Sequence, residues 1–200
     1  MVDKRIKKTK KNLKSTFISL MSSTSFEDIT ITELCKQADI SRITFYTHYS
    51  DKYALLDDIF QDMIQIGSRI YRRMQNKNNP ERDYVKSYCN VLHTILELYY
   101  SNYEFFCHTR PDKNPYLAFS FYNYALTTIE NYTQQKEAES LQLESLHFKY
   151  SARKIAGFLC YGLAGFINEG YAENLPLETI QAEATNLLTS LLTSNVLIES

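Results

Sequence analysis

Apolar residues recur at helical spacing along most of the chain. One helical stripe covers residues 13–21, and a second, over residues 31–38, follows the i, i+3, i+4, i+7 spacing of an amphipathic helix. The residues of the two stripes are Leu13, Phe17, Leu20, Met21, Ile31, Leu34, Cys35 and Ala38. No convincing stretch alternates polar and apolar residues between turns, as a strand would. The sequence therefore predicts an all-α protein.

Short polar residues mark where the helices of the N-terminal part begin and end. Thr30 is the expected N-cap of the second helix, and Glu33 completes a capping box. Asp39 tolerates the left-handed backbone of a tight turn, and Ser41 caps a third helix directly after it. A longer fourth helix follows Ser50. Two short helices joined by a tight turn and packed on a first helix make a helix-turn-helix.

The third helix has one narrow apolar face and one broad mixed face. At about 100° per residue, Phe45 and Tyr49 share a face that predicts packing on a core. The remaining arc carries Arg42, Ile43, Thr44, Tyr46, Thr47 and His48. A helix that contacts base edges in a DNA groove and phosphates beside it needs hydrogen-bond donors on side chains of different length. A helix that only faces solvent more often carries Glu and Lys.

The stretch FEDITITELCKQADISRITFYTHYSDKYALL resembles the DNA-binding module of the TetR/AcrR family of transcriptional regulators. The matching positions are Thr30, Ile31, Leu34, Ala38, Ile40, Ser41, Thr44, Phe45, Tyr46, His48, Tyr49 and Lys52. Asp39 stands where the family usually has Gly, and Ile43, a bulky apolar residue near the groove, stands where Gly is frequent. The specific matches cover about residues 13–60. Beyond them only helical organisation and length agree.

This resemblance implies a set of DNA contacts. It assigns phosphates to Thr44, Tyr46, His48 and Lys52, and base edges to Arg42, Ile43 and Thr47, with Thr30 and Ser41 completing the set. The expected position of Lys52 at the start of the fourth helix agrees, because the amides there also favour a phosphate.

Charge is distributed unevenly along the chain. Residues 1–14 carry a net charge of +6, and the other 186 residues carry −7. The basic residues proposed as an N-terminal arm are Lys4, Arg5, Lys7, Lys8, Lys10 and Lys11. Such asymmetry suggests an arm for a polyanion such as DNA. The alternative is a solvated, fraying N-terminus.

The pattern divides the chain into a DNA-binding domain over residues 1–60 and a helical ligand-binding and dimerisation domain over residues 61–200. In the second domain, helices are expected at about 80–100, 102–109, 115–135, 140–172 and 176–194. The segment NKNNP at 76–80 is the expected connection after the fourth helix.

Aromatic residues are abundant in the second domain. The candidate effector pocket comprises Tyr88, Tyr99, Tyr103, Phe106, Phe119, Tyr122 and Phe158. Buried tyrosine hydroxyls need hydrogen-bond partners, and a small molecule bound in a pocket could provide them. Core tyrosines bonded to backbone carbonyls are the equal alternative.

Small residues interrupt the helix KIAGFLCYGLAGFINEGY, and a leucine-rich stripe follows over residues 180–192. Small residues allow close helix approach, so these two segments predict a four-helix dimer interface of the kind that TetR-type dimers use. The expected interface residues are Gly157, Tyr161, Gly162, Gly165, Ala184, Leu187, Leu188 and Leu191. An intrachain core is the alternative.

Other classes of function find no support. No phosphate loop, nucleophile elbow or H-E-x-x-H motif occurs, so we expect no enzyme, no catalytic residue and no cofactor. Cys89 and His93 have i, i+4 spacing, but Cys107 and His108 do not complete a ligand set, so we expect no metal.

Scattered cysteines, an interrupted apolar stretch near the start and the lack of a membrane-length run predict a cytoplasmic protein without membrane contact.

The expected function is a repressor that binds a palindromic operator on double-stranded DNA as a homodimer and answers to an effector in its C-terminal domain. The resemblance also implies an alternative, an activator whose C-terminal domain binds a partner protein, as in regulators of dihydroxyacetone kinase operons.

Overall fold

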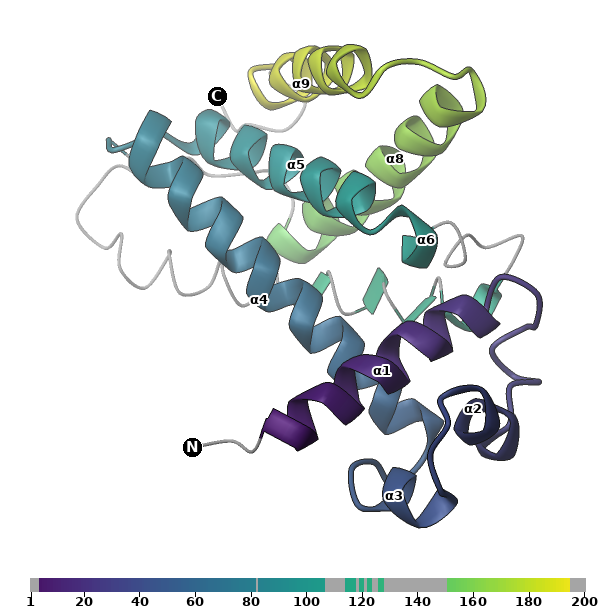
Figure 1. Ribbon diagram of the computed structural model, residues 1–200. Coiled ribbons are helices and arrows are strands. Elements are labelled where there is room, and N and C mark those ends of the chain that lie inside the picture. The colour runs from purple at the N-terminus through teal and green to yellow at the C-terminus, as the bar shows by residue number, and fades with distance from the viewer. Residues whose placement is uncertain are drawn as a thin grey trace. The chain divides into compact units, whose positions relative to one another are not determined.

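The computed structural model describes residues 4–81, 83–106, 114–117, 119–120, 122–123, 126–127 and 151–194. These residues form helices and connecting turns, with no strand among them, so the predicted all-α class is confirmed. The helices are α1 (Lys4–Leu20), α2 (Ile31–Gln37), α3 (Arg42–Tyr46), α4 (Lys52–Asn78), α5 (Tyr84–Ser101), α6 (Tyr103–Phe106), α8 (Ala152–Ala172) and α9 (Leu177–Leu192) (Figure 1).

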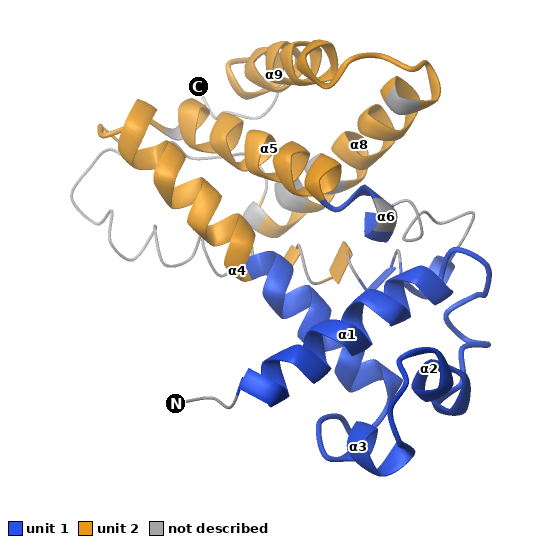
Figure 2. Cartoon of the chain, viewed as in Figure 1, with its two compact units in different colours: residues 1–64, 102–121 blue, residues 65–101, 122–200 orange. Residues whose placement is uncertain are grey.

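The chain packs into two compact units (Figure 2). Unit 1 contains residues 1–64 and 102–121, and unit 2 contains residues 65–101 and 122–200. The division falls inside α4, so one continuous helix supplies residues to both units. Described residues between 102 and 120 belong to unit 1, although they follow α5 of unit 2 along the chain, and the domains expected at 1–60 and 61–200 stay a prediction.

The core of unit 1 is formed by the apolar faces that the periodicity indicates. α1 contributes Leu13, Phe17 and Leu20, all buried. The other buried apolar residues described in this unit are Met21, Phe26, Ile29, Leu34, Cys35, Ala38, Phe45, Tyr49, Leu55, Leu56, Ile59, Phe60, Met63, Phe105, Phe106 and Leu117. A core of this size can hold the short helices α2 and α3, which are too short to be stable alone.

Aromatic contacts explain why residues after α5 return to unit 1. Phe105 packs edge-to-face on Phe60, with ring centroids 5.7 Å apart. Phe26 stacks on Tyr116 at 4.9 Å, and its backbone N–H donates to Asn114 Oδ1 at 2.8 Å. These contacts attach the segment around residue 115 to the loop between α1 and α2.

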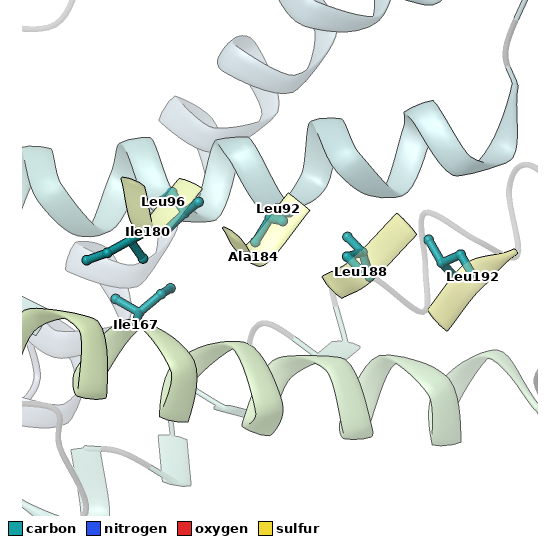
Figure 3. Packing of buried hydrophobic residues seen from close by; sticks show 7 residues of the cluster. All are labelled: Leu92, Leu96, Ile167, Ile180, Ala184, Leu188 and Leu192. Carbon is teal, nitrogen blue, oxygen red and sulfur yellow. The ribbon is translucent and has the colours of Figure 1, made fainter. Parts of the chain in front are cut away.

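The core of unit 2 lies between α5, α8 and α9 (Figure 3). Its buried residues are Leu92, Leu96, Ile167, Ile180, Ala184, Leu188 and Leu192. The α9 members recur every four residues, so a single face of α9 packs on α5. Gly170 permits the close approach of α8 to α9, because a Cβ there would lie 2.8 Å from Ile180 Cγ1.

A cluster of buried amides closes the turn between α4 and α5. Gln75 Nε2 donates to Tyr71 Oη and Ser87 Oγ, and Asn90 Nδ2 donates to Gln75 Oε1 at 2.6 Å. Asn79 Nδ2 donates to the Asp83 carbonyl, and the Asp83 N–H donates back to Asn79 Oδ1. Since these buried amides have partners, the cluster fixes the register of the two helices at little desolvation cost.

Helix limits differ from the predictions in the second half of the chain. α8 begins at Ala152 and Ser151 is not helical, so the helix expected at 140–172 is interrupted there, and residues 140–150 lie outside the described residues. α6 ends at Phe106, and the expected continuation to residue 109 lies outside the described residues. Every described residue of the helix expected at 115–135, namely 115–117, 119–120, 122–123 and 126–127, is helical, and the others lie outside the described residues.

Candidate nucleic-acid interface

Local hydrogen bonds shape the turn between α2 and α3 as predicted. Thr30 Oγ1 accepts from the Glu33 N–H at 3.1 Å and caps α2. At the other end Asp39 has a φ of 52°, and the Ile40 N–H donates to the Cys35 carbonyl at 3.0 Å. This left-handed residue with its backbone bond ends α2 in the manner of a Schellman motif. The chain can therefore reverse direction within the few residues before α3.

Ser41 fixes the start of α3. Its Oγ accepts from the Thr44 N–H at 3.0 Å and lies 2.9 Å from Thr44 Oγ1. Both side chains thus belong to the capping arrangement. They would present only their remaining lone pairs and hydroxyl hydrogens to a ligand.

The two faces of α3 are those that the sequence predicted. Phe45 is fully buried and Tyr49 nearly so, whereas Ile43 is 79% exposed and Tyr46 is 48% exposed. The other residues expected to contact DNA are exposed, as Arg42 and Thr47 are, or partly exposed, as Thr44 and His48 are. One side of a short helix therefore anchors it, and the opposite side presents a cation, an aliphatic group, a phenol and a hydroxyl.

The third helix is shorter than predicted, because the sequence pattern placed residues from Arg42 to Tyr49 on it and α3 ends at Tyr46. The N–H groups of His48 and Tyr49 both donate to the Phe45 carbonyl, at 2.9 and 3.0 Å. Thr47 Oγ1 donates to the Thr44 carbonyl at 2.7 Å. These bonds convert the last part of the expected helix into a tight turn, and Tyr49 still reaches the core.

Asp58 of α4 connects three elements of unit 1. Its carboxylate accepts from Tyr49 Oη at 2.7 Å and from Lys10 Nζ at 3.1 Å, and it lies 3.2 Å from Lys14 Nζ. Burial opposes ionisation of Asp58, but the hydrogen bonds from Tyr49, Lys10 and Lys14 outweigh it and lower its pKa. Burial, followed by the bond to Asp58, raises the pKa of Tyr49.

Sequence analysis did not identify Asp58 as a positioning residue. The signal available was an acidic residue adjacent to the apolar stripe of α4. Only the fold shows that it meets α1 and the end of the α3 turn. The network also includes Lys14, which contacts Asp62.

Lys52 has a different role from the predicted phosphate contact. Its Nζ donates to the carbonyls of Phe26, Glu27 and Ile29, at 2.8, 2.6 and 3.1 Å. An ammonium group has three N–H donors, so these bonds use all of them. Lys52 therefore closes the loop between α1 and α2, and it has no N–H left for a phosphate while these three bonds hold.

The predicted basic arm is the first part of α1 and is helical from Lys4. Lys10 is paired with Asp58 and lies 4.9 Å from the centre of the Tyr49 ring, so it belongs to the Asp58 network. The other residues of the predicted arm, Lys4, Arg5, Lys7, Lys8 and Lys11, are exposed. No acidic residue occupies the first turn, so Lys4, Arg5 and Lys7 there face an unfavourable helix dipole. This local cost is consistent with a function for the positive charge.

The residues expected to form an effector pocket are divided between the two units. Tyr88 and Tyr99 pack against the core of unit 2, and Phe106 is buried in unit 1. Phe119 and Phe158 are mostly exposed. Tyr103 belongs to unit 1, and Tyr122 packs on Tyr161 in unit 2, with ring centroids 4.2 Å apart.

A surface hollow of about 620 Å³ in unit 2 is lined by a different set of residues, Arg73, Met74, Lys77, Asn78 and His93. The effector pocket thus stays a prediction.

The residues expected at a dimer interface separate into two groups. Ala184 and Leu188 are buried in the intrachain core, which corrects their assignment to an interface. Gly157 lies beside Tyr122 in the same unit, since a Cβ would be 2.9 Å from Tyr122 Oη. In contrast Tyr161, Gly162, Gly165 and Leu187 are exposed and Leu191 is partly exposed.

Two further findings concern metals and membranes. Among the described residues, no group of three His, Cys, Asp or Glu side chains could hold a metal ion. His93 lies against Gln181 and Glu97, while Cys107 and His108 lie outside the described residues. No described helix combines the length and the apolar character that crossing a membrane requires.

Comparison with known proteins links this geometry to a fold. No family model matches the chain, and no curated protein matches its sequence. A protein from Syntrophomonas wolfei assigned to the TetR-family transcriptional regulators superposes with a TM-score of 0.69 at 11% identity, over 95% of this chain and 97% of its own.

Two other solved structures have a similar fold over most of the chain. The fatty acid degradation regulator FadR of Bacillus halodurans has a TM-score of 0.64 at 12% identity, over 90% of this chain and 94% of its own. FadR of Thermus thermophilus, a TetR-family repressor solved with lauroyl-CoA, has a TM-score of 0.56 at 18% identity, over 90% of this chain and 92% of its own. The chain therefore has the fold of the TetR-family transcriptional regulators.

Proposed function

We propose that the protein is a TetR-family transcriptional regulator that binds an inverted-repeat site on double-stranded DNA as a homodimer. The observation that carries the proposal is the exposed face of α3, which Ser41 and the buried Phe45 hold in place. A fixed helix face of this composition suits the major groove, where base edges present acceptors, donors and the thymine methyl.

The exposed residues divide by reach and chemistry. Arg42, Ile43 and Thr47 are the proposed base contacts. The proposed phosphate contacts are Thr30, Thr44, Tyr46 and His48, together with Ser41 through what its cap leaves available. Exposed cations of α1, such as Lys7, Lys8 and Lys11, add attraction that does not depend on sequence.

The exposed surface of unit 2 supports the proposed self-association. α8 exposes Phe158 and Tyr161 in consecutive turns, and among the described residues nothing lies within 4 Å of a Cβ added at Gly162 or Gly165. α9 adds Leu187. An apolar surface with open space above its glycines suits a second copy of the same helices. A recognition helix as short as α3 contacts few base pairs, so one subunit alone would have little selectivity. A dimer doubles the number of base pairs that are contacted.

We further propose that the regulator is a repressor whose unit 2 binds an effector. α4 runs from unit 1 into unit 2, so a shift in its second half would reach the residues that hold α3. In the proposed dimer, the two copies of α3 must be separated by the distance that the two half-sites require. An effector that prefers a state with another separation would weaken DNA binding, and DNA would weaken effector binding equally. Activation through a partner protein stays the alternative prediction.

The test is in vitro selection from a library of random duplexes with the full chain, followed by titration of the selected site. We expect an inverted repeat that is bound far more tightly than a scrambled duplex. Arg42→Ala should weaken binding by about 1–3 kcal/mol and relax preference at one position of each half-site. Arg72→Ala, an exposed arginine in unit 2, is the matched control. Equal affinity for selected and scrambled duplexes would refute the proposal.

A further inference from the structure

Ile43 is the most exposed of the large apolar residues described in the structure, at 79%. A single exposed aliphatic residue is common on protein surfaces and by itself carries no meaning. This one lies on a helix of five residues, between Arg42 and Thr44, and takes no part in the buried core. As a β-branched residue it is also a poorer helix former than Ala. Neither folding nor helix stability accounts for an isoleucine here.

The position of Ile43 is fixed more firmly than that of most surface residues. Ser41 caps the helix two residues earlier, and the buried Phe45 anchors it two residues later. A β-branched side chain in a helix has one strongly preferred χ1 rotamer. Its methyl groups therefore project from α3 in a restricted direction, as a contact that depends on shape requires.

Thr47 extends the apolar character of this face by one turn. It is the residue directly after α3, its N–H donates to the Ile43 carbonyl at 3.0 Å, and it is exposed. Its hydroxyl hydrogen is donated to the Thr44 carbonyl at 2.7 Å. Thr47 therefore offers a ligand a methyl group and an oxygen lone pair, and no donor while that bond lasts.

The ligand chemistry follows from this pair. In the major groove, the only apolar group on a base edge is the 5-methyl of thymine, and cytosine lacks it. We infer that Ile43, supported by Thr47, recognises the 5-methyl group of a thymine in each half-site of the DNA. This inference rests on the proposed function and adds to it a specificity that polar side chains do not supply.

The experiment removes single methyl groups from the DNA. Each thymine of the selected site is replaced in turn by deoxyuridine, which keeps every hydrogen-bonding group. We expect one symmetry-related pair of thymines to be sensitive, with an affinity loss of about four-fold for one methyl and about fifteen-fold for both. At the same positions cytosine should bind more weakly than 5-methylcytosine. Thymines elsewhere in the site are the internal control.

Variants of Ile43 connect the effect to the side chain. Ile43→Ala should bind the thymine and deoxyuridine sites equally, while Ile43→Val, which keeps the branched carbon, should retain part of the preference. Because the side chain is exposed, both variants should melt at the wild-type temperature.

Each outcome decides a different statement. If wild-type protein selects a site but no thymine is sensitive to loss of its methyl, or if Ile43→Ala keeps the wild-type preference, the inference about Ile43 is wrong while the proposed function stands. If no site is selected at all, the proposed function fails and the inference fails with it. Should Ile43→Ala not fold, the deoxyuridine series on wild-type protein still decides the thymine contact.

Discussion

α3 and α9 both carry apolar residues at helical spacing, but the two helices divide them differently between core and surface. Phe45 of α3 and Tyr49 of the turn after it enter the core, and the opposite face of α3 carries mainly polar and charged groups. In α9, one stripe of leucines contributes Leu188 to the core and leaves Leu187 about half exposed. The narrow apolar face of α3 is used up by the core of unit 1. The broader apolar surface of α9 packs on the core of unit 2 and still leaves apolar residues exposed, which a second protein could contact.

The difference has a functional counterpart. The exposed face of α3 is polar apart from Ile43, which suits a hydrated, charged ligand. The exposed surface of α8 and α9 combines aromatic rings, glycines and a leucine, which suits another protein surface. The following substitutions test this contrast, beginning with the largest expected effect.

The strongest test compares two neighbouring leucines. Leu188→Glu should unfold unit 2, because a buried carboxylate without a partner costs more than about 4 kcal/mol, a large part of the stability of a domain. Leu187→Glu should keep the wild-type melting temperature of the isolated chain but reduce self-association, measured by light scattering at micromolar concentration. Loss of fold in Leu187→Glu, or a stable wild-type monomer, would remove the distinction between the two faces.

A second pair makes the same comparison in α3. Phe45→Ala should destabilise unit 1 by about 3–5 kcal/mol, since it empties a fully buried site. Tyr46→Ala should change the unfolding free energy by less than about 1 kcal/mol and weaken DNA binding instead. Chemical denaturation and titration of the selected DNA site measure the two effects. Similar destabilisation by both changes would show that α3 has no face available for a ligand.

Asp58 gives a prediction about pH. Its pKa is lowered in the folded state, so its contribution to stability is present above its unfolded pKa of about 3.9 and is lost as pH falls through the folded value. Wild type should lose unfolding free energy in this acid range. Asp58→Asn should be less stable than wild type at neutral pH by about 1–3 kcal/mol and should lack this part of the acid dependence.

The control for Asp58 is its neighbour Asp57, which is exposed. Asp57→Asn should keep both the stability at neutral pH and the acid dependence of wild type. Equal acid dependence of Asp58→Asn and wild type would mean that the contacts to Lys10, Lys14 and Tyr49 do not stabilise the folded state.

The smallest expected effect concerns single lysines of α1. Lys8→Gln should weaken binding to all duplexes alike and reduce the slope of log affinity against log salt by up to about 1, if Lys8 meets one phosphate. Lys10→Gln should instead act mainly on stability, because Lys10 is paired with Asp58. A salt slope that Lys10→Gln changes and Lys8→Gln leaves alone would reverse the proposed roles.

Short-range rules made much of unit 1 predictable. The caps by Thr30 and Ser41, the left-handed Asp39 and the two faces of α3 depend on contacts within a few residues, which the sequence displays directly. The length of α3 was not predictable in the same way. Its end is set by the turn that lets Tyr49 reach Asp58, nine residues further along the chain.

By itself, the sequence determined the helical class, the helix-turn-helix and the face of α3 that would be buried, because periodicity and capping are local properties. Only the tertiary structure decided which leucines of α9 pack against α5. It also decided which three carbonyls accept hydrogen bonds from Lys52, and that Asp58 connects α1 to the turn after α3. These outcomes depend on which distant segments come together. The sequence around a lysine or a leucine does not show which distant residue it will contact.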